Sequence, residues 1–449
     1  MTVVIRPPEN VLDILRIFRE NSYDAYAVGG CVRDSVLGKE PKDWDIATNA
    51  LPAAIKALFE KTIDTGLAHG TVTVMLKGEA YEVTTFRIDG KYEDGRHPTR
   101  VEFTGRLEDD LRRRDFTMNA MAWKEESGIV DPFDGMKDIA AGVIRAVGKP
   151  GERFREDALR MLRAIRFAAR LGFEIHCETL EAICENSGLI NSVSSERIRE
   201  ELNGILSADN PMKFDILRET GLLKLILPEF EACFNTPQRN PHHVYNVGEH
   251  SLRAVTAIEP DKCLRWTMLL HDTGKAVTRI TDDKGIDHFY GHPEKSMEIA
   301  GDILGRLRFD NRSISRILRL IKYHDREILP QPRAVAKAVH AVGDDIFLDL
   351  MKVKRADKFA QNPLDKQKGM EYVDLIESIY NKLKTENNCL KLKELAVNGG
   401  DLIELGFEEG REVGQMLAFL FQKVLDDPAL NDKKILSELA ARLFIKRKE

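Results

Sequence analysis

The sequence of 449 residues has no apolar run that approaches the roughly 20 residues of a membrane-spanning helix. Residues 6–9 (Arg-Pro-Pro-Glu) stand where a secretory signal needs an apolar stretch. The six cysteines are scattered and include no C-x-x-C pair, so neither a zinc ribbon nor a disulfide framework is indicated. We therefore expect no membrane partner, a cytoplasmic location, and cysteines that are reduced and structural.

A basic excess is missing as well, since the net charge is −6. Composition alone therefore does not indicate a nucleic-acid binder, and any such binding must depend on local groups of Arg and Lys. A hydrophobic content of 43% with 31% charged residues is ordinary for a globular protein. The length exceeds what one hydrophobic core usually supports, so several domains are expected.

Short β-type segments dominate residues 23–147, among them 26–28, 71–76 and 81–87, with glycines between them. After Pro150-Gly151 the pattern changes to long helical periods that continue almost to Glu449. The sequence predicts an α+β fold, with a small head (1–148) built on a mixed or antiparallel sheet with helices. All-α parts follow: a neck (149–234), a body (235–390) and a tail (391–449).

Two aspartates two residues apart, Asp43 and Asp45, follow a Gly29-Gly30 turn. In a strand such residues project from one side, and Mg²⁺ prefers carboxylates combined with phosphate and water. Bare backbone N–H groups at the glycines can approach a triphosphate, and Arg33 can clamp it. Glu82 is the candidate third carboxylate of a two-metal site. Either motif alone is common in turns, but their order predicts a catalytic site of Asp43, Asp45 and Glu82.

The stretch 156–170 carries charges at helical spacing, and we predict that they share one helix stripe: Asp157, Arg160, Arg163, Arg166 and Arg170. A solvated ladder of ion pairs is one interpretation. The other is base selection, because a carboxylate only accepts hydrogen bonds and a guanidinium only donates them. Adenine and cytosine present an amino donor beside a ring-nitrogen acceptor, whereas guanine and uracil reverse this order. Asp157 with Arg160 would then accept A and C without a template.

Three arginines precede Asp115 in Leu111-Arg-Arg-Arg-Asp115, and Asn119 follows one turn later. Arg113 and Arg114 can reach phosphates, and Asp115 or Asn119 can bond ribose hydroxyls, which favours NTP over dNTP. Alternatively, Asp115 caps the start of a helix.

Together these stretches resemble the class II tRNA nucleotidyltransferase and bacterial poly(A) polymerase family of the polymerase-β-like superfamily. The resemblance is carried by GGCVRD (29–34), DWD (43–45), RRDFTMNA (113–120), EDALRMLRAIRF (156–167) and SERIREEL (195–202). It implies nucleotide contact by Gly30, Arg33 and Arg114, and metal binding by Asp43 and Asp45. It also implies base selection by Asp157 and Arg160 with support from Arg163 and Arg166, and a bracing role for Glu196 and Arg197.

Relatives that add only CC lack a flexible loop that is present here, in which residues 87–98 follow the family's R-x-D-x-x-Y-x-D-x-R-x-P pattern. The resemblance therefore disfavours a CC-only activity. Poly(A) polymerases of the family are more basic toward the C-terminus, so the acidic balance of this chain favours tRNA as the substrate.

A second group of motifs resembles the metal ligands of HD-type phosphohydrolases, with His250, His271, Asp272 and Asp357 as ligands of a divalent cation and His292 and His324 as extra candidates. Isolated histidines are often packed without function, but adjacent His271-Asp272 followed by Gly274-Lys275 favours a site. Some relatives use this module for phosphatase or phosphodiesterase work, and others keep it as a platform for tRNA.

We therefore expect CCA tRNA nucleotidyltransferase activity, with ATP and CTP as substrates, Mg²⁺ as the cofactor, tRNA as the partner and no protein partner implied. The alternatives are A-only addition, poly(A) synthesis, or hydrolysis by the histidine module as the main activity. A non-catalytic RNA-binding protein is disfavoured, because the residues that would carry catalysis are intact.

Overall fold

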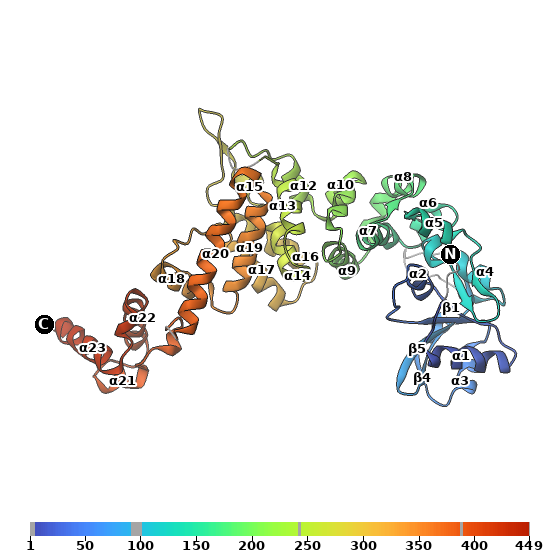
Figure 1. Ribbon diagram of the computed structural model, residues 1–449, viewed down its shortest axis with the longest axis horizontal. Helices are drawn as coiled ribbons and strands as arrows, with labels where there is room; N and C mark the ends of the chain where they lie inside the picture. Colours follow the sequence, from blue (N-terminus) through green and yellow to red (C-terminus); the bar gives the residue numbers. More distant parts are fainter. Residues whose placement is uncertain (1–4, 91–100, 241–243, 387–388, 449) are drawn as a thin grey trace. The chain divides into compact units, whose positions relative to one another are not determined.

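The computed structural model describes residues 5–90, 101–240, 244–386 and 389–448. The chain divides into two compact units, Met1–Pro228 and Glu229–Glu449 (Figure 1). The four-part division into head, neck, body and tail stays a prediction. Among the described helices, none is both long and apolar enough to cross a membrane.

The first unit begins with a seven-stranded sheet in the order β3-β4-β5-β2-β1-β8-β9. Its strands are β1 (Ala25–Val28), β2 (Asp45–Thr48), β3 (Thr62–Gly66), β4 (Thr71–Leu76), β5 (Glu79–Thr85), β8 (Ala122–Lys124) and β9 (Gly128–Val130). Only β2 and β5 pair in parallel, and the other neighbours are antiparallel. The mixed sheet confirms the predicted α+β class.

Helices and a short hairpin complete the head: α1 (Glu9–Glu20), α2 (Gly30–Val36), α3 (Pro52–Leu58), α4 (Leu107–Arg112), α5 (Gly135–Ala141), β6 (Arg87–Asp89) and β7 (Val101–Phe103). Helix α1 buries Val11, Ile14 and Phe18 at spacings of three and four, as an amphipathic helix does. Val28 of β1 and Ala47 of β2 belong to the buried core, so the ends of these two strands are held rigidly.

A helical segment follows the head within the same unit: α6 (Pro150–Glu156), α7 (Leu159–Leu171), α8 (Cys177–Asn186), α9 (Ser195–Leu206), α10 (Ile216–Glu219) and α11 (Leu222–Ile226), with the parallel pair β10 (Val143–Ile144) and β11 (Glu174–Ile175). Helix α12 (Pro228–Phe234) begins at the last residue of this unit and continues into the second. The predicted helix over 156–170 is wrong at its start. Asp157 has an extended backbone (φ −146°, ψ 104°) and separates α6 from α7. Its carboxylate accepts a hydrogen bond from the backbone N–H of Leu159, which competes with helix continuation.

The second unit is helical apart from the pair β12 (Ile280–Thr281) and β13 (Asp287–His288). Its helices are α13 (Val247–Thr256), α14 (Lys262–Leu270), α15 (Lys275–Thr278), α16 (His292–Arg306), α17 (Asn311–Tyr323), α18 (Pro332–Val342), α19 (Phe347–Ala360), α20 (Pro363–Thr385), α21 (Gly399–Glu404), α22 (Arg411–Asp426) and α23 (Lys433–Lys448). All six cysteines of the chain are free, in agreement with the absence of a disulfide pattern.

An ion pair between the buried Asp115 and the partly exposed Arg163 joins the head to α7. Both the Nε and Nη2 atoms of Arg163 donate to Asp115 Oδ2, at 2.9 and 2.7 Å. The Asp115 carboxylate also accepts from the Asn119 amide and the Phe116 backbone N–H. Burial alone would raise its pKa, but Arg163 and Asn119 together lower the pKa of Asp115 to about 2. These bonds therefore fix the position of α7 against the head.

We predict that Asp115→Asn lowers the free energy of unfolding at pH 7 by about 2–4 kcal/mol, because it leaves Arg163 without its buried counter-charge. The folded-state pKa lies below the ordinary value of 3.8. The stabilisation is therefore present above about pH 4 and is lost as the pH falls toward 2. Urea unfolding of both proteins between pH 7 and 3 measures whether the difference shrinks with acid.

The matched control is Lys137→Gln, which breaks the exposed Asp134–Lys137 pair and should lower the free energy of unfolding far less than Asp115→Asn does. Equal effects of the two substitutions would contradict a structural role for Asp115.

Candidate active site

The turn between β1 and α2 is shaped by Gly29, whose φ of +77° favours glycine. A Cβ atom at this position would lie 2.7 Å from Arg114 Nη1. The guanidinium of Arg114 therefore lies directly against the turn, and it is held there by Asp110 Oδ2 at 3.2 Å. Gly30 follows as the first residue of α2, so the predicted strand, glycine turn and helix occur in that order.

The three predicted carboxylates, Asp43, Asp45 and Glu82, line one cleft of about 760 Å³. Trp44 between the two aspartates is buried, whereas the aspartates are exposed. Strand β2 begins only at Asp45, so Asp43 lies just before the strand rather than in it. The parallel register of Ile46 with Val83 places Asp45, the first residue of β2, beside Glu82 in the middle of β5.

Electrostatics agrees with this crowding of carboxylates. Desolvation raises the pKa of Asp45, Arg114 opposes the rise, and the negative charges of Glu82 and Asp43 add to it. Like charges in one cleft are stabilised by cations, so the residues present fit a divalent ion. Among the described residues, the groups of three or more side chains close enough to share an ion all lie in the second unit. An ion in this cleft would therefore need further ligands from phosphate or water.

Arg33 lies inside the protein, with only 4% of its surface exposed. It donates to Asn119 Oδ1 at 2.6 Å and to Asp34 Oδ1 at 2.7 and 2.9 Å, and its guanidinium stands 5.1 Å from the Phe167 ring centre. Asn119 also donates to Asp115. A continuous chain of polar contacts thus runs from the glycine turn to the ion pair of Asp115 and Arg163.

The predicted base-reading residues already have protein partners. The Asp157 carboxylate accepts hydrogen bonds from both Nη groups of Arg197, at 3.2 and 2.8 Å. Arg160 donates to Glu156 Oε2 at 2.6 Å and to the carbonyl oxygen of Arg113 at 2.9 Å. Arg166 donates to Glu201 at 2.6 Å. The contact between Asp157 and Arg197 gives the latter the bracing position that the resemblance implied.

Two residues that sequence reasoning did not single out organise these arginines. Asp110 is fully buried and pairs with both Arg113 and Arg114, which hold its pKa below the ordinary value although burial acts to raise it. The Phe167 ring lies 4.5 Å from Arg166 and 5.6 Å from Arg163. The E-D-D sequence of α4 resembles a solvated first turn, and only tertiary packing reveals that Asp110 is inside.

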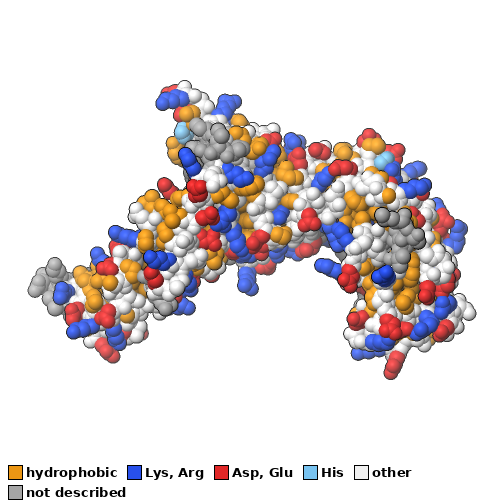
Figure 2. All heavy atoms as spheres, in the orientation of Figure 1, with side chains coloured by type: hydrophobic (Ala, Val, Ile, Leu, Met, Phe, Trp, Pro, Cys, Tyr) orange, Lys and Arg blue, Asp and Glu red, His pale blue; other side chains and the backbone are white. Residues whose placement is uncertain are grey.

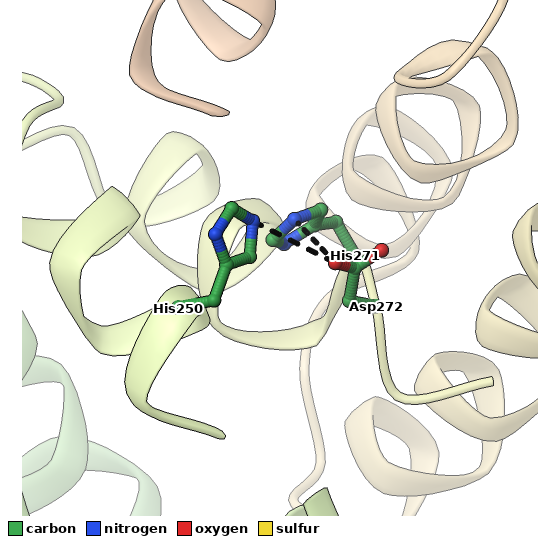
Figure 3. Close-up of side chains that lie close together, drawn as sticks. All are labelled: His250, His271 and Asp272. Atoms are coloured by element: carbon green, nitrogen blue, oxygen red, sulfur yellow. Dashed lines mark ion pairs between the residues drawn. The ribbon is translucent and has the colours of Figure 1, made fainter. Parts of the chain in front are cut away.

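Three of the predicted metal ligands in the second unit, His250, His271 and Asp272, lie close together (Figure 3). His250 Nε2 lies 3.0 Å from Asp357 Oδ1 and 3.6 Å from Asp272 Oδ2, and His271 Nε2 lies 3.3 Å from Asp272 Oδ2. His250, His271 and Asp272 are almost completely buried. Such a set of imidazole nitrogens and carboxylate oxygens is typical of divalent-metal sites.

Charge coupling in this cluster is strong. Burial would lower the pKa of His271, but the carboxylates of Asp272 and Asp357 raise it to about 10. Burial would likewise raise the pKa of Asp272, but His271 and Lys275 hold it well below the ordinary range. The Asp272 carboxylate is therefore ionised, and a metal ion at His271 Nε2 would have to displace the proton of this imidazole.

Three family models match the chain. Residues 25–145 match the poly A polymerase head domain, and residues 172–234 match a probable RNA and SrmB-binding site of polymerase A. Residues 292–440 match a putative tRNA nucleotidyltransferase domain 2. The fold and the head therefore define a nucleotidyltransferase, which confirms the predicted enzyme class.

Relatives extend over nearly the whole chain. The CCA-adding enzyme of Ligilactobacillus salivarius is 35% identical over 440 residues, 97% of this chain and 96% of that protein. The CCA-adding enzyme of Geobacillus stearothermophilus is 35% identical over 439 residues, 96% of both. The crystal structure of the Bacillus stearothermophilus CCA-adding enzyme in complex with CTP covers 99% of both chains with a TM-score of 0.71 at 30% identity. The chain belongs to the CCA-adding enzyme family.

The Thermotoga maritima CCA-adding enzyme complexed with tRNA has the same fold, with a TM-score of 0.62 at 22% identity and coverage of 98% of this chain and 97% of that one. The family resemblance predicted from the sequence is thus confirmed. None of the three family models describes an HD-type domain, so the HD-type nature of the body stays a prediction.

We predict that Gly29→Ala reduces nucleotide incorporation at least about tenfold, because the new methyl group displaces Arg114 from the turn and strains a left-handed backbone. Gly38→Ala is the matched control, since Gly38 has a similar φ of +69° but open space around the added Cβ. Incorporation of labelled ATP by both variants gives the comparison. An equal loss in both would assign the effect to backbone strain rather than to Arg114.

Proposed function

We propose that this protein adds C, C and A to the 3′ end of tRNA from CTP and ATP without a nucleic-acid template, releasing pyrophosphate. The observation that carries the proposal is the cleft that Asp43, Asp45 and Glu82 line together, with Arg114 close enough to act on the charge of Asp45. Full-length relationship to CCA-adding enzymes supports tRNA, CTP and ATP as the substrates.

In this mechanism the backbone N–H groups at Gly29 and Gly30 and the side chain of Arg114 bind the triphosphate. Asp43 and Asp45 hold two Mg²⁺ ions, with Glu82 as third carboxylate, and the ions supply charge neutralisation at the phosphates. Arg33, which lies inside the protein, supports the turn from beneath through Asn119 and Asp34. Direct contact of Arg33 with the nucleotide requires that it exchange these partners.

The reaction joins the tRNA 3′-hydroxyl oxygen to the α-phosphorus of the nucleotide as the bond to pyrophosphate breaks. We propose that Glu82 accepts the proton of the hydroxyl, because this carboxylate is exposed in the cleft and stands next to Asp45.

Base selection falls to Asp157 and Arg160. Their acceptor and donor groups match the Watson–Crick edges of adenine and cytosine and mismatch those of guanine and uracil. Because Asp157 is bonded to Arg197 and Arg160 to Glu156, a bound base must replace part of these contacts. A wrong base leaves buried polar groups unpaired, at about 1–3 kcal/mol each, so the exchange discriminates against it. Arg163 and Arg166 keep α7 in place through Asp115 and Glu201.

Addition of A alone and poly(A) synthesis are less favoured than full CCA addition, because the full-length relatives are CCA-adding enzymes. The loop pattern that disfavours CC-only addition includes residues 91–100, which lie outside the described residues.

Binding of the tRNA backbone is expected from Arg and Lys side chains. Figure 2 shows these interspersed with Asp and Glu on the visible face of both units. On this face, local groups of cations rather than a continuous basic patch would make the phosphate contacts.

The histidine cluster supports a second candidate function. We propose that His250, His271, Asp272 and Asp357 hold a divalent cation, as the resemblance to HD-type phosphohydrolases implied; the distances among their side chains support this. Such an ion can activate water, and a hydrolytic activity in the second unit would be separate from nucleotide addition.

We predict that Asp43→Ala and Asp45→Asn each reduce incorporation of labelled ATP into tRNA ending in CC by at least about a thousandfold, because an essential metal ligand is lost. Glu82→Gln should retain nucleotide binding and lose turnover. Asp64→Asn, in the exposed Lys56–Asp64 pair of the same sheet, is the control and should remain near full activity. Retained incorporation by Asp43→Ala would refute the proposed metal site.

For base selection, Asp157→Asn should reduce ATP and CTP incorporation about 10- to 100-fold while raising the relative use of GTP and UTP, because an amide can donate as well as accept. Each NTP is supplied singly to tRNA ending at the discriminator base, C or CC. Glu200→Gln, in the exposed Arg199–Glu200 pair of α9, is the control. An unchanged ratio of the four nucleotides would remove Asp157 from base selection.

A further inference from the structure

Strand β2 separates two sides of the candidate active site. In the sheet it lies between β1 and β5. Asp45, the first residue of β2, pairs with Val28 at the end of β1, and the glycine turn follows directly after Val28. On the other side of β2, Asp45 stands beside Glu82 of β5. The glycine turn and Glu82 therefore flank Asp45 from opposite sides.

The two substrates of the proposed reaction use these two sides separately. In the proposed mechanism the triphosphate binds at the glycine turn and Arg114. The attacking and leaving oxygens lie in line across the α-phosphorus, so the RNA 3′-hydroxyl and pyrophosphate are on opposite sides of it. With the α-phosphate over Asp45 and pyrophosphate toward the glycine turn, the hydroxyl approaches from the side of β5. The end of the RNA therefore lies beside β5.

The cleft of about 760 Å³ lies on this side of the site. Its lining includes Thr73 of β4 with Glu79 and Glu82 of β5, whereas Arg114 and the glycine turn are not among the described residues that line it. Thr73 stands directly opposite Glu82 in the β4–β5 register, and its Oγ1 lies 2.9 Å from Thr65 Oγ1 of β3. This wall of the cleft is therefore fixed across three strands, and the space beside it suits the RNA end rather than the triphosphate.

Charge limits what can enter this cleft. Its described lining carries four carboxylates and one cation: Asp43, Asp45, Glu79, Glu82 and Lys42. An RNA end brings further negative charge, and the ions proposed at Asp43 and Asp45 neutralise the phosphates of the nucleotide. The last phosphodiester of the RNA is one nucleotide away from the reacting hydroxyl, so it needs a cation of its own. Lys42 is the cation that the cleft offers.

Lys42 is placed to make such a contact. The chain bends at Lys42 and β2 begins only at Asp45, so the alternation of a strand does not turn Lys42 away from the cleft. Its side chain is exposed, whereas Lys56 of the same head is held by Asp64 at 2.9 Å. A lysine binds phosphate as a flexible point charge, which suits an RNA end that carries different bases in turn.

The carboxylate of Glu79 has protein partners of its own. Its Oε2 atom accepts hydrogen bonds from the Asn10 amide, at 2.9 Å, and from the Tyr81 hydroxyl. These bonds fix Glu79 at the start of β5 and satisfy part of its charge. Lys42 is therefore left to a ligand in the cleft.

We propose that Lys42 binds the last phosphodiester of the RNA 3′ end and so places the terminal hydroxyl beside Glu82. This inference rests on the proposed nucleotide addition, and it assigns the position of the second substrate at the same site. Lys42 contacts the RNA and not the nucleotide, so its loss weakens the binding of one substrate only.

The first test compares Lys42→Gln with the wild type in the addition of ATP to tRNA ending in CC. The KM for tRNA should rise about five- to tenfold because one phosphate contact is lost, whereas the KM for ATP should change less than about twofold. Lys42→Arg keeps the charge and should restore most of the affinity for tRNA. Lys56→Gln, which removes the same charge from the exposed Lys56–Asp64 pair, is the control. An equal rise in both KM values would assign Lys42 to the triphosphate and overturn the proposal, as would two unchanged KM values.

The second test replaces the last phosphodiester of the same tRNA with an uncharged methylphosphonate. Binding is measured with Mg²⁺ but without ATP, so it does not depend on turnover. The wild type should bind the modified tRNA about five- to tenfold more weakly than the unmodified tRNA, and Lys42→Gln should bind the two about equally. A methylphosphonate one nucleotide further from the end is the matched control, and with it the difference between the two proteins should persist. An equal loss of affinity in both proteins at the last position would overturn the contact.

These outcomes separate the inference from the proposed function. Failure of the wild type to incorporate any nucleotide would contradict the proposed CCA addition, whichever phosphate Lys42 contacts. Intact incorporation without the link between Lys42 and the last phosphodiester would contradict only the contact proposed here.

Discussion

The pairing of Asp115 with Arg163 is the constraint on which the first unit depends. A fully desolvated carboxylate is stable only with a counter-charge and hydrogen bonds, and here α7 and Asn119 supply them. Because Asn119 also accepts from Arg33 beneath the glycine turn, one buried charge links the phosphate side of the site to the helix that carries Arg160. A shift of α7 would expose the Asp115 carboxylate to water or leave it without its counter-charge. The distance between the glycine turn and α7 is therefore set by electrostatics as much as by packing.

This arrangement explains why the arginines of the neck are paired before any nucleotide binds. Guanidinium groups so close together repel unless each has an acceptor, and the chain supplies Glu156, Glu201 and Asp115. Pre-paired groups lose less conformational entropy when a base arrives. The cost is that a base must compete with an existing partner, which only a complementary edge does well. In the proposed mechanism, selectivity without a template arises from exchange of hydrogen bonds rather than from an unoccupied, preformed pocket.

Local patterns predicted much of the fold. The alternating residues 71–76 form β4 at the predicted bounds, and the glycine turn lies between β1 and α2 as its composition indicates. The helix predicted over 156–170 is interrupted at Asp157. Helical periodicity does not show that this side chain accepts a hydrogen bond from the backbone N–H two residues ahead. The roles of Asp110 and Phe167 were not predicted for a different reason. Both side chains pack against segments that are distant in the sequence, and local residue spacing carries no information about such packing. The sequence could nominate His292 and His324, but only the structure shows that the Nε2 atoms of both lie 3.4 Å from Asp272 Oδ1.

The carboxylates of the two proposed metal sites differ in their exposure and in their neighbouring groups. This difference indicates how each site would acquire its ions. Asp43 and Asp45 are exposed oxygen donors with no histidine in their cleft, which suits a weakly held Mg²⁺ that enters together with a triphosphate. Asp272 is buried among imidazole nitrogens, which favour transition metals and hold them without a substrate. In the proposed mechanism, an ion that arrives with its nucleotide would leave with pyrophosphate, so the head would be reset after every addition. An ion held by the histidines would stay in place between turnovers, as the proposed hydrolytic function requires.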